Sequence, residues 1–173
     1  LRQNEMEGNI SISYQRNPSY FNALKVEGMQ NQVIVARDKK INKIVGFGTR
    51  SIKPVYVNGK VQNIGYLSNL RVNKDYRGKK LLSKGYNYLR KLHQDKKVPI
   101  YYSTIIEDNK ITIRILTSKK PYLPLYHDMG RYCTIVVNLS KKGKNVKGNF
   151  RIIRGSKNIL EKIVKFLNKN GAS

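Results

Sequence analysis

The chain has 173 residues, of which 35 are Lys or Arg and 10 are Asp or Glu, so its formal net charge is +25 at pH 7. This length suits one ordinary domain, or one domain and part of another, and a hydrophobic fraction of 39% is enough to bury a core, which excludes wholesale disorder. No apolar run approaches the roughly 18–20 residues that a membrane-spanning helix needs, which excludes an integral membrane protein.

The compartment is predicted from two features. No charged segment followed by an apolar segment indicates a signal peptide. Cys133 is the single cysteine, so the sequence predicts neither a disulfide framework nor a multi-cysteine metal site. We therefore expect a reducing, intracellular location in the cytoplasm.

The positive charge admits several anionic partners. A charge of +25 attracts nucleic acid, anionic lipid or a phosphorylated small molecule. The basic residues are mostly Lys (24, against 11 Arg) and are spread along the chain, as an AT-rich coding sequence also produces. Sites that read nucleic-acid sequence more often concentrate Arg, because its planar fork pairs with base edges. We expect at least non-specific, salt-sensitive binding to polyanions.

The predicted elements follow one another in a mixed pattern. Apolar periodicity and β-branched runs predict a helix, three strands, a helix, a strand, a helix and a strand, at residues 18–26, 32–38, 44–57, 61–72, 79–94, 100–106, 110–118 and 132–139. In the first helix we expect Phe21 and Leu24 to face inward. This order predicts a mixed α/β (α+β) fold with a sheet flanked by helices.

Two glycines carry local information in the strands. Asn58-Gly59 is a strong hairpin signal, because both central positions of a type I′ turn need a positive φ. It predicts an antiparallel pairing of residues 51–57 with residues 61–72. Gly65, inside the second strand, predicts a bulge or a close approach.

The two later helices have apolar faces. In residues 79–94 the predicted inward positions are Leu81, Leu82, Gly85, Tyr88, Leu89 and Leu92. Residues 107–109 offer N-capping oxygens for the next helix, in which Ile111, Ile115 and Leu116 are expected to face inward. The apolar run 100–106 is typical of a central strand.

Residues 70–82 carry the chemistry. A strand ends at Val72 and a polar turn leads directly into a helix. The first turn of a helix has unpaired N–H groups and the positive end of the macrodipole, so a diphosphate can bind there. Gly78 allows close approach, and Arg77, Lys79 and Lys80 add positive charge. The alternative is a solvated basic turn, in which these cations oppose the helix dipole.

This segment resembles motif A of the GNAT superfamily of N-acetyltransferases. Residues 100–109 are similar to that family's fifth strand and the Asn that opens the next helix, and residues 126–132 to the passage before its last strands. The resemblance covers residues 33–139. It departs at two positions where the family has small residues and this chain has Lys80 and Leu82.

The resemblance implies a GNAT fold: a mostly antiparallel twisted sheet in which two parallel strands splay apart and hold acetyl-coenzyme A. Backbone groups of Leu70 and Val72 would bind the pantetheine arm, and Asn109 would touch that arm. The N–H groups from Arg77 to Leu82 would hold the diphosphate. The implied cofactor-binding residues are Leu70, Arg71, Val72, Arg77, Gly78, Lys79, Lys80, Leu81, Leu82 and Asn109.

The resemblance also implies transfer of the acetyl group to a primary amine by direct attack. The family's usual acid position is occupied here by Leu116, so we expect Tyr126 to act as the acid, with a packed core tyrosine as the alternative. Glu107 is the expected base. Asp108 is more typical of a helix cap.

The remaining reactive side chains have simpler interpretations. His127 is a further candidate base, with an ordinary surface histidine as the alternative. His93 is expected to be structural or exposed, and Cys133 to be a small core residue. We predict no metal site.

The sequence says less about the acceptor and about the domain organisation of the chain. The resemblance implies that the acceptor site is lined by residues 49–63 and residues 20–27. Because this lining would be basic, it favours a neutral or anionic amine-bearing acceptor over a polycation. Two other functions fit the same fold: an inactive GNAT-fold binding module and a basic nucleic-acid-associated protein. We expect a GNAT domain at 1–139, then a linker and a strand-helix extension at 140–173, which is either the start of a second GNAT-like half or a helix that packs on the sheet.

Overall fold

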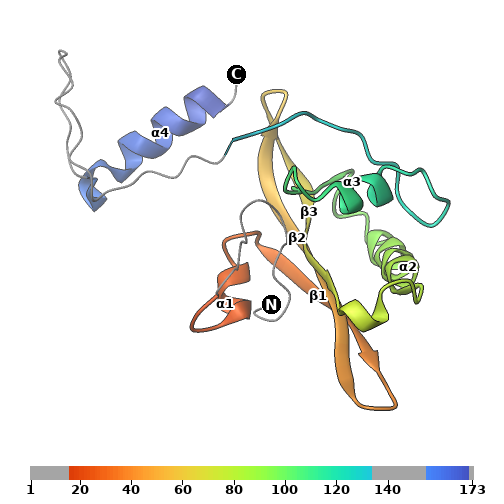
Figure 1. Cartoon of the computed structure of the whole chain (residues 1–173). Coiled ribbons are helices and arrows are strands. Elements are labelled where there is room, and N and C mark those ends of the chain that lie inside the picture. Colours follow the sequence, from red (N-terminus) through yellow and green to blue (C-terminus); the bar gives the residue numbers. More distant parts are fainter. Residues whose placement is uncertain (1–15, 134–154, 172–173) are drawn as a thin grey trace, which may run out of the picture. The chain divides into compact units, whose positions relative to one another are not determined.

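The computed structural model describes residues 16–133 and 155–171 of the chain (Figure 1). The chain forms two compact units, Leu1–Tyr126 and His127–Ser173. The first holds the sheet and three helices, and the second holds one helix within its described part. The predicted domain boundary at residue 139 falls outside the described residues and stays a prediction.

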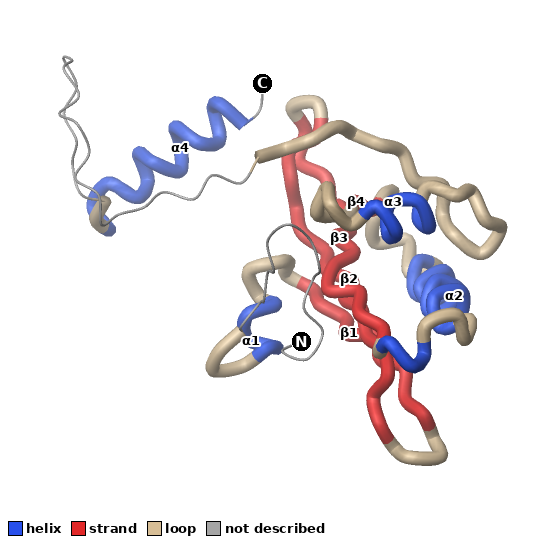
Figure 2. Tube along the Cα trace, in the orientation of Figure 1, coloured by secondary structure: helices blue, strands red, loops and turns tan. Residues whose placement is uncertain are grey.

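A four-stranded sheet forms the centre of the first unit (Figure 2). Its strands lie in the order β1, β2, β3, β4, with bounds Gln30–Asp38, Lys43–Val57, Lys60–Val72 and Tyr101–Tyr102. The first three strands pair antiparallel, and β4 pairs parallel to β3. The predicted mixed α+β class with a mostly antiparallel sheet is therefore confirmed.

The β2–β3 hairpin forms where the sequence predicts it. Asn58 and Gly59 connect the strands with φ values of 49° and 73°, which are the two positive angles that a type I′ turn needs. Val57 pairs with Lys60 across this turn. The short loop thereby fixes the register of the two longest strands.

Gly65 and the bulge of β3 are separate features. The close approach at Gly65 is confirmed, because a Cβ there would lie 2.1 Å from Cδ1 of Tyr101. The bulge lies further along, where Thr49 pairs with Ser68 but Phe47 pairs with Arg71. The extra residue follows Ser68, and Asn69 takes the positive φ of 58° that lets the strand accommodate it.

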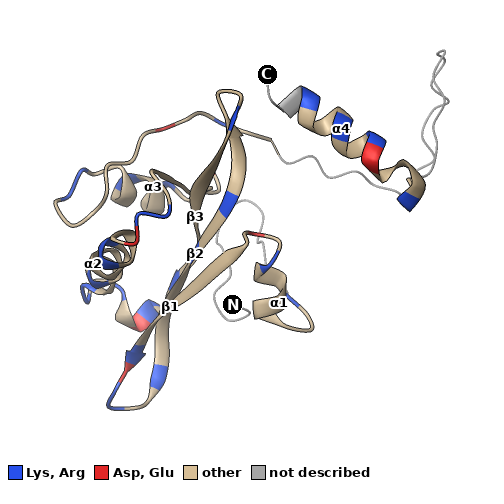
Figure 3. Cartoon of the chain, turned by 180° about the vertical axis from the view of Figure 1, so that it is seen from behind, with Lys and Arg blue, Asp and Glu red and all other residues tan. Residues whose placement is uncertain are grey.

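Helices cover both faces of the sheet (Figures 1 and 3). On one face lies α1 (Tyr20–Leu24), and on the other lies α2 (Leu81–His93). A short 3-10 turn, η1 (Lys74–Tyr76), leads from β3 to α2, and α3 (Lys110–Leu116) follows β4. Because neighbouring residues of a strand point to opposite faces, each strand contributes side chains to both layers.

The core is small and mostly aliphatic. Its buried members are Leu24, Val45, Ile52, Ile64, Leu89, Val98, Leu116 and Leu123. Three predicted inward residues are wrong, because Phe21, Tyr88 and Ile111 are exposed. On α2, Tyr86 is half-buried, whereas Tyr88, two positions further along, is exposed.

The segment predicted as the strand 100–106 is much shorter in the structure. Only Tyr101 and Tyr102 pair with β3, and the chain then leaves the sheet before α3. Most of the predicted strand 132–139 and the predicted linker after it lie outside the described residues. Within the described part, β4 is therefore the last strand in the sheet order.

The described part of the second unit ends in a helix, as the apolar periodicity predicts. The 3-10 turn η2 (Lys157–Ile159) leads into α4 (Leu160–Gly171). Leu160, Ile163, Val164 and Leu167 repeat at the spacing of one helix face, and all four are exposed. The predicted strand before this helix lies outside the described residues.

Candidate functional site

Strands β3 and β4 separate after two residue pairs. Gly65 pairs with Tyr101 and Tyr66 with Tyr102, and the Gly65 amide donates to the carbonyl of Ile100 at 3.0 Å. The rings of Tyr66 and Tyr102 stack with centroids 4.6 Å apart at the last pair. Beyond it, no described strand pairs with β3 on this side, because β4 ends at Tyr102 and the chain leaves the sheet there.

The free edge of β3 presents backbone groups beyond this pairing. The amide of Asn73, just past the strand, donates to the carbonyl of Val45 on β2 at 2.8 Å. Backbone groups alternate between the two edges of a strand, so those of Val72 and Leu70 point to the opposite, unpaired edge. The Leu70 carbonyl accepts a hydrogen bond of 2.8 Å from the side chain of Arg71.

The turn between β3 and α2 is anchored at both of its ends. The side chain of Asn73 accepts a hydrogen bond from the Asp75 amide at 3.0 Å. The Tyr76 hydroxyl donates to the Asp38 carboxylate at 2.7 Å, which lowers the pKa of Asp38 and raises that of Tyr76. The ammonium of Lys79 lies 4.6 Å from the centroid of the Tyr76 ring. These contacts fix the path of the chain into the helix.

Two residues of this turn have positive φ angles. Gly78 has φ 79°, and Lys80, the N-cap of α2, has φ 57° and ψ 16°. Residues other than glycine rarely adopt this left-handed backbone conformation. Lys80 thus takes a backbone conformation that glycine adopts without strain.

The amides of this turn divide into two groups. Those of Arg77 and Lys79 donate to carbonyls of the turn itself, at 3.1 and 3.3 Å. The amides of Gly78 and of residues 80–83 have no backbone partner among the described residues, and the first helical bond runs from Lys84 to Lys80. Together with the exposed cations of the turn, they form a donor set that suits a diphosphate.

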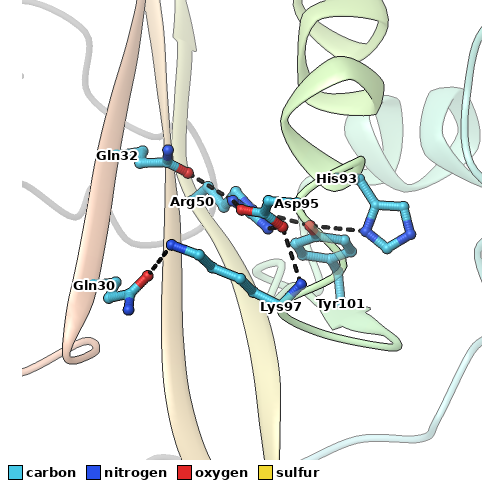
Figure 4. A network of polar contacts seen from close by, with 7 residues as sticks. All are labelled: Gln30, Gln32, Arg50, His93, Asp95, Lys97 and Tyr101. Atoms are coloured by element: carbon cyan, nitrogen blue, oxygen red, sulfur yellow. Dashed lines mark hydrogen bonds and ion pairs between the residues drawn. The ribbon is translucent and has the colours of Figure 1, made fainter.

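A buried arginine cluster lies where β3 and β4 part, on the α2 side (Figure 4). The side chain of Arg50 is fully buried and donates to both carboxylate oxygens of Asp95, at 2.7 and 2.9 Å. It also donates to Gln32 on β1 at 2.7 Å and to the Tyr101 hydroxyl at 2.9 Å. One buried charge therefore connects β1, β2, β4 and the segment after α2.

This cluster determines the ionisation of its members. The hydrogen bond from Arg50 lowers the pKa of Asp95 to about 2, and the same interaction raises the pKa of Arg50. Burial raises the pKa of Tyr101. His93 adds a contact of 3.2 Å from its Nδ1 to the Tyr101 hydroxyl, which gives this exposed residue the structural role that the sequence predicts.

The start of α3 is capped as predicted. The side chain of Asn109 accepts a hydrogen bond from the amide of Thr112 at 3.2 Å. Leu116, at the family's usual acid position, is buried with 4% of its surface exposed. It fills part of the core of the first unit.

Tyr126, the predicted acid, meets a second tyrosine. Its hydroxyl lies 2.7 Å from that of Tyr86 on α2, and the two rings pack edge to face. Burial raises the pKa of Tyr86 well above its usual range, and the neighbouring Tyr126 adds to this effect. The raised pKa keeps the Tyr86 hydroxyl protonated beside Tyr126.

The other predicted reactive residues lie on the surface. Glu107 and Asp108 are exposed in the turn between β4 and α3, and His127 is exposed just after the first unit. Cys133 is free and exposed, so the prediction of a small core residue is wrong. No group of His, Cys, Asp and Glu side chains in the described ranges could hold a metal ion.

Sequence analysis missed a polar cluster on the α1 face. Ser68 on β3 donates to the Glu27 carboxylate at 2.7 Å, and the Asn69 side-chain amide donates to Ser68 Oγ at 2.9 Å. Arg16 forms an ion pair with the same carboxylate. Glu27 and Ser68 lie 41 positions apart in the chain, so no local pattern could have predicted their contact.

The charge distribution has no single focus. Lys and Arg are spread over the helices and strands of the described chain rather than gathered on one element (Figure 3). A helix of sufficient length and apolarity to cross a membrane does not occur among the described residues.

Family comparison agrees with this geometry. The profile of the acetyltransferase (GNAT) family matches residues 5–117, which is well over half of the chain. The chain therefore belongs to the GNAT family of acetyltransferases. No curated protein matches it in sequence.

Several solved structures share the fold. A mutant of the BH1408 protein from Bacillus halodurans has 17% identity and a TM-score of 0.58, over 75% of this chain and 80% of that one. An acetyltransferase from Trypanosoma brucei has 16% identity and a TM-score of 0.50, over 68% and 75%. An aminoglycoside acetyltransferase from an uncultured soil metagenomic sample has 16% identity and a TM-score of 0.50, over 71% and 79%. At these identities the likeness establishes the GNAT fold.

Proposed function

We propose that the protein is an acetyl-coenzyme A-dependent N-acetyltransferase that acts on a primary amine. The observation that carries this proposal is the end of the β3–β4 pairing at Tyr66 and Tyr102, together with a turn in which the amides of Gly78 and of residues 80–83 have no backbone partner among the described residues. Family membership supports the same chemistry. Acetyl-coenzyme A supplies an acetyl thioester, whose carbonyl carbon an amine can attack.

The residues present fit this co-substrate. Gly78 and Lys80 turn their backbone with positive φ angles, so the amides of Gly78 and of residues 80–82 form the proposed diphosphate site. A Cβ at Gly78 would meet nothing within 4 Å, so the turn leaves space there. The side chains of Arg77, Lys79 and Lys80 add positive charge around it.

The proposed arm site follows the free edge of β3. Backbone groups of Leu70 and Val72 point to this edge and would bind the amides of the pantetheine arm. Arg71 and Asn109 flank the path, and Asn109 does so while capping α3. The proposed diphosphate site follows shortly after Val72 in the chain, so the arm would run from there toward the pair Tyr66–Tyr102, and its reactive end would lie near that pair.

Catalysis needs an acid and a base near that reactive end. Tyr126 remains the proposed acid, since the hydrogen bond to Tyr86 holds its hydroxyl in place and a protonated phenol can donate to a departing sulfur. Glu107 remains a candidate base from the sequence. The backbone of the diverging β3 edge supplies donors for the oxygen that gains negative charge during attack.

The extension at residues 140–173 is proposed as a separate structural segment. Its helix α4 exposes one apolar face, as expected of a helix that packs against a partner element. The spread of basic residues also leads us to propose weak binding to polyanions, which should weaken as salt rises.

Two measurements test the proposed function. Acetyl-coenzyme A at about 100 times its Kd should stabilise the protein by about 2.7 kcal/mol in a thermal unfolding series. A thiol-release assay over a panel of primary amines should then detect turnover. Lys80→Glu should weaken acetyl-coenzyme A binding, whereas Lys84→Glu, one turn along α2, should weaken it much less.

The outcomes separate the alternatives. Stabilisation without thiol release over the panel would indicate an inactive binding module. Absence of stabilisation, together with nucleic-acid binding that persists near physiological salt, would favour a nucleic-acid-associated protein.

A further inference from the structure

We propose that the Glu27 carboxylate, held at the bulge of β3 by Ser68, forms the subsite that receives the ammonium group of the acceptor and takes one proton from it. This inference rests on the proposed function and adds to it the place and the residue that bind the reacting amine. It identifies the acceptor, by chemical class, as a molecule with a primary ammonium group.

Ser68 lies on the part of β3 beyond its pairing with β4. Ser68 lies two residues past Tyr66, the last β3 residue that pairs with β4, and directly before the bulge residue Asn69. It is therefore on the part of β3 that has already left β4. The reactive end of the co-substrate is expected at this point of the strand.

The side chain of Ser68 lies on the α1 face of the sheet. Ser68 pairs with Thr49, whose hydroxyl lies 2.9 Å from the hydroxyl of Tyr20 on α1. Side chains opposite each other in an antiparallel pair share a face, so Ser68 points to the α1 side. Tyr101 and the Arg50 cluster occupy the opposite, α2 side. The Glu27 subsite thus lies across the sheet from α2 and the proposed acid Tyr126.

The Glu27 carboxylate has more acceptor positions than its two hydrogen-bonding partners occupy. One carboxylate oxygen accepts from Ser68 at 2.7 Å, and the other pairs with Arg16. An ionised carboxylate has about four acceptor positions, so an ammonium group can bind without displacing either partner. Only 12% of the side chain is exposed, which strengthens its attraction for a cation.

The neighbouring charged groups fit this role. Arg16 also donates a hydrogen bond to the Asn69 side chain at 3.3 Å and lies over the ring of Tyr20. These contacts hold the Arg16 guanidinium in place beside the Glu27 carboxylate. Burial raises the pKa of Tyr20, which keeps its hydroxyl protonated and uncharged. Two other carboxylates of this unit already hold partners elsewhere, Asp38 with Tyr76 and Asp95 with Arg50.

The chemical step is a single proton transfer. An acceptor arrives as an ammonium ion, and its nitrogen has no free electron pair until one proton leaves. That proton moves to the Glu27 carboxylate, which becomes a neutral acid, while the ammonium becomes a neutral amine. The carboxyl then releases the proton to solvent, so the group is restored.

A pair of coenzyme A thioethers tests this inference without any acceptor or turnover. S-(2-aminoethyl)-coenzyme A carries an ammonium group where S-propyl-coenzyme A carries a methyl group, and the two are otherwise matched. We expect the wild-type protein to bind the charged probe about tenfold more tightly, as measured by isothermal titration. Glu27→Gln should remove this preference and leave the affinity for the propyl probe unchanged.

Two further variants keep the result decisive. Ser68→Ala leaves the carboxylate in place but frees it to move, so the preference should fall without vanishing. Glu107→Gln, which changes the other candidate base, should retain the full preference. The unchanged affinity for the propyl probe shows in each case that the variant is folded.

The failures can be told apart. Equal affinity of the wild-type protein for both probes, or a preference that Glu27→Gln retains, would overturn the inference and leave the proposed function intact. A preference that Glu107→Gln removes would place the subsite at Glu107 and also overturn it. Failure of the wild-type protein to bind either probe would overturn both the inference and the proposed function.

Discussion

The ring of Tyr101 lies so close to Gly65 that a Cβ at this position would be 2.1 Å from ring atom Cδ1 and 2.4 Å from Cε1. This contact joins β3 to β4 at the first of their two residue pairs. The hydroxyl of the same tyrosine is held by Arg50. The start of the short β3–β4 pairing is therefore fixed by one residue without a side chain and one with a large, anchored side chain.

A methyl group at position 65 should disturb this point. We expect Gly65→Ala to lower the free energy of unfolding by about 1–3 kcal/mol, because the Tyr101 ring must move away. Gly85→Ala is the matched control. It lies within α2 with nothing near its Cβ position, and it should raise the free energy by about 0.5–1 kcal/mol. Urea denaturation measures both, and equal effects of the two variants would contradict the packing described here.

The Asp95–Arg50 pair should make stability depend on pH. The pKa of Asp95 is lowered from its ordinary value of 3.8 to about 2. A lowered folded-state pKa stabilises the protein fully above the unfolded value, and this contribution is lost as pH falls from about 5 to about 2. Asp95→Asn should therefore flatten the decline of the unfolding midpoint over this range.

An exposed carboxylate serves as the control for this pH dependence. Asp75 lies on the surface of the turn before α2 and makes no ion pair among the described residues. Asp75→Asn should leave the acidic decline as steep as in the wild-type protein. If Asp95→Asn and the wild-type protein showed the same profile, the ion pair would not form in solution.

Lys80 and Lys84 should respond in opposite ways to glycine. Lys80 has a positive φ, which glycine adopts without strain, so Lys80→Gly should change the free energy of unfolding by about 0 to +1 kcal/mol. Lys84 lies inside α2, where glycine should cost about 1 kcal/mol. Chemical denaturation of the two variants compares them directly. A clear loss of stability in Lys80→Gly would show that the turn does not have this conformation.

Two serine hydroxyls on the α1 face should also differ. Ser51 is fully buried, and its hydroxyl has no hydrogen-bond partner among the described residues, so Ser51→Ala should stabilise the protein by about 1 kcal/mol. Ser68 Oγ has two partners, so Ser68→Ala should destabilise it by about 1 kcal/mol. The same denaturation series measures both. Destabilisation by Ser51→Ala would indicate that its hydroxyl has a partner in solution.

Local signals in the sequence predicted much of the fold. Asn58-Gly59 predicted the hairpin because a type I′ turn restricts its two central residues. Asn109 predicted the start of α3 through its capping side chain. Apolar spacing predicted α2 and α4, since one face of each helix repeats every three or four residues. In each case the cause lies within a few residues of its effect.

Features that depend on distant contacts were not predictable in this way. In the sequence, Arg50 is one basic residue within a predicted strand. It is buried beside Gln32 and Asp95 because of the sheet register and the path of the segment after α2, which no local pattern predicts. Glu27 lies in the connection between α1 and β1, and it meets Ser68 on β3 across 41 positions of sequence. Lys80 departs from the family's sequence pattern, and the pattern alone did not predict that its backbone would adopt a positive φ.

A crystal structure with coenzyme A is the most direct test of the central claim, that the amides at the start of α2 bind the diphosphate beside the diverging strands. We predict diphosphate oxygens within about 2.7–3.2 Å of the amides of Gly78 and residues 80–82. The arm should run along Leu70 and Val72 toward Tyr66. A diphosphate bound at another place on the molecule, or an arm that avoids the free edge of β3, would contradict the account.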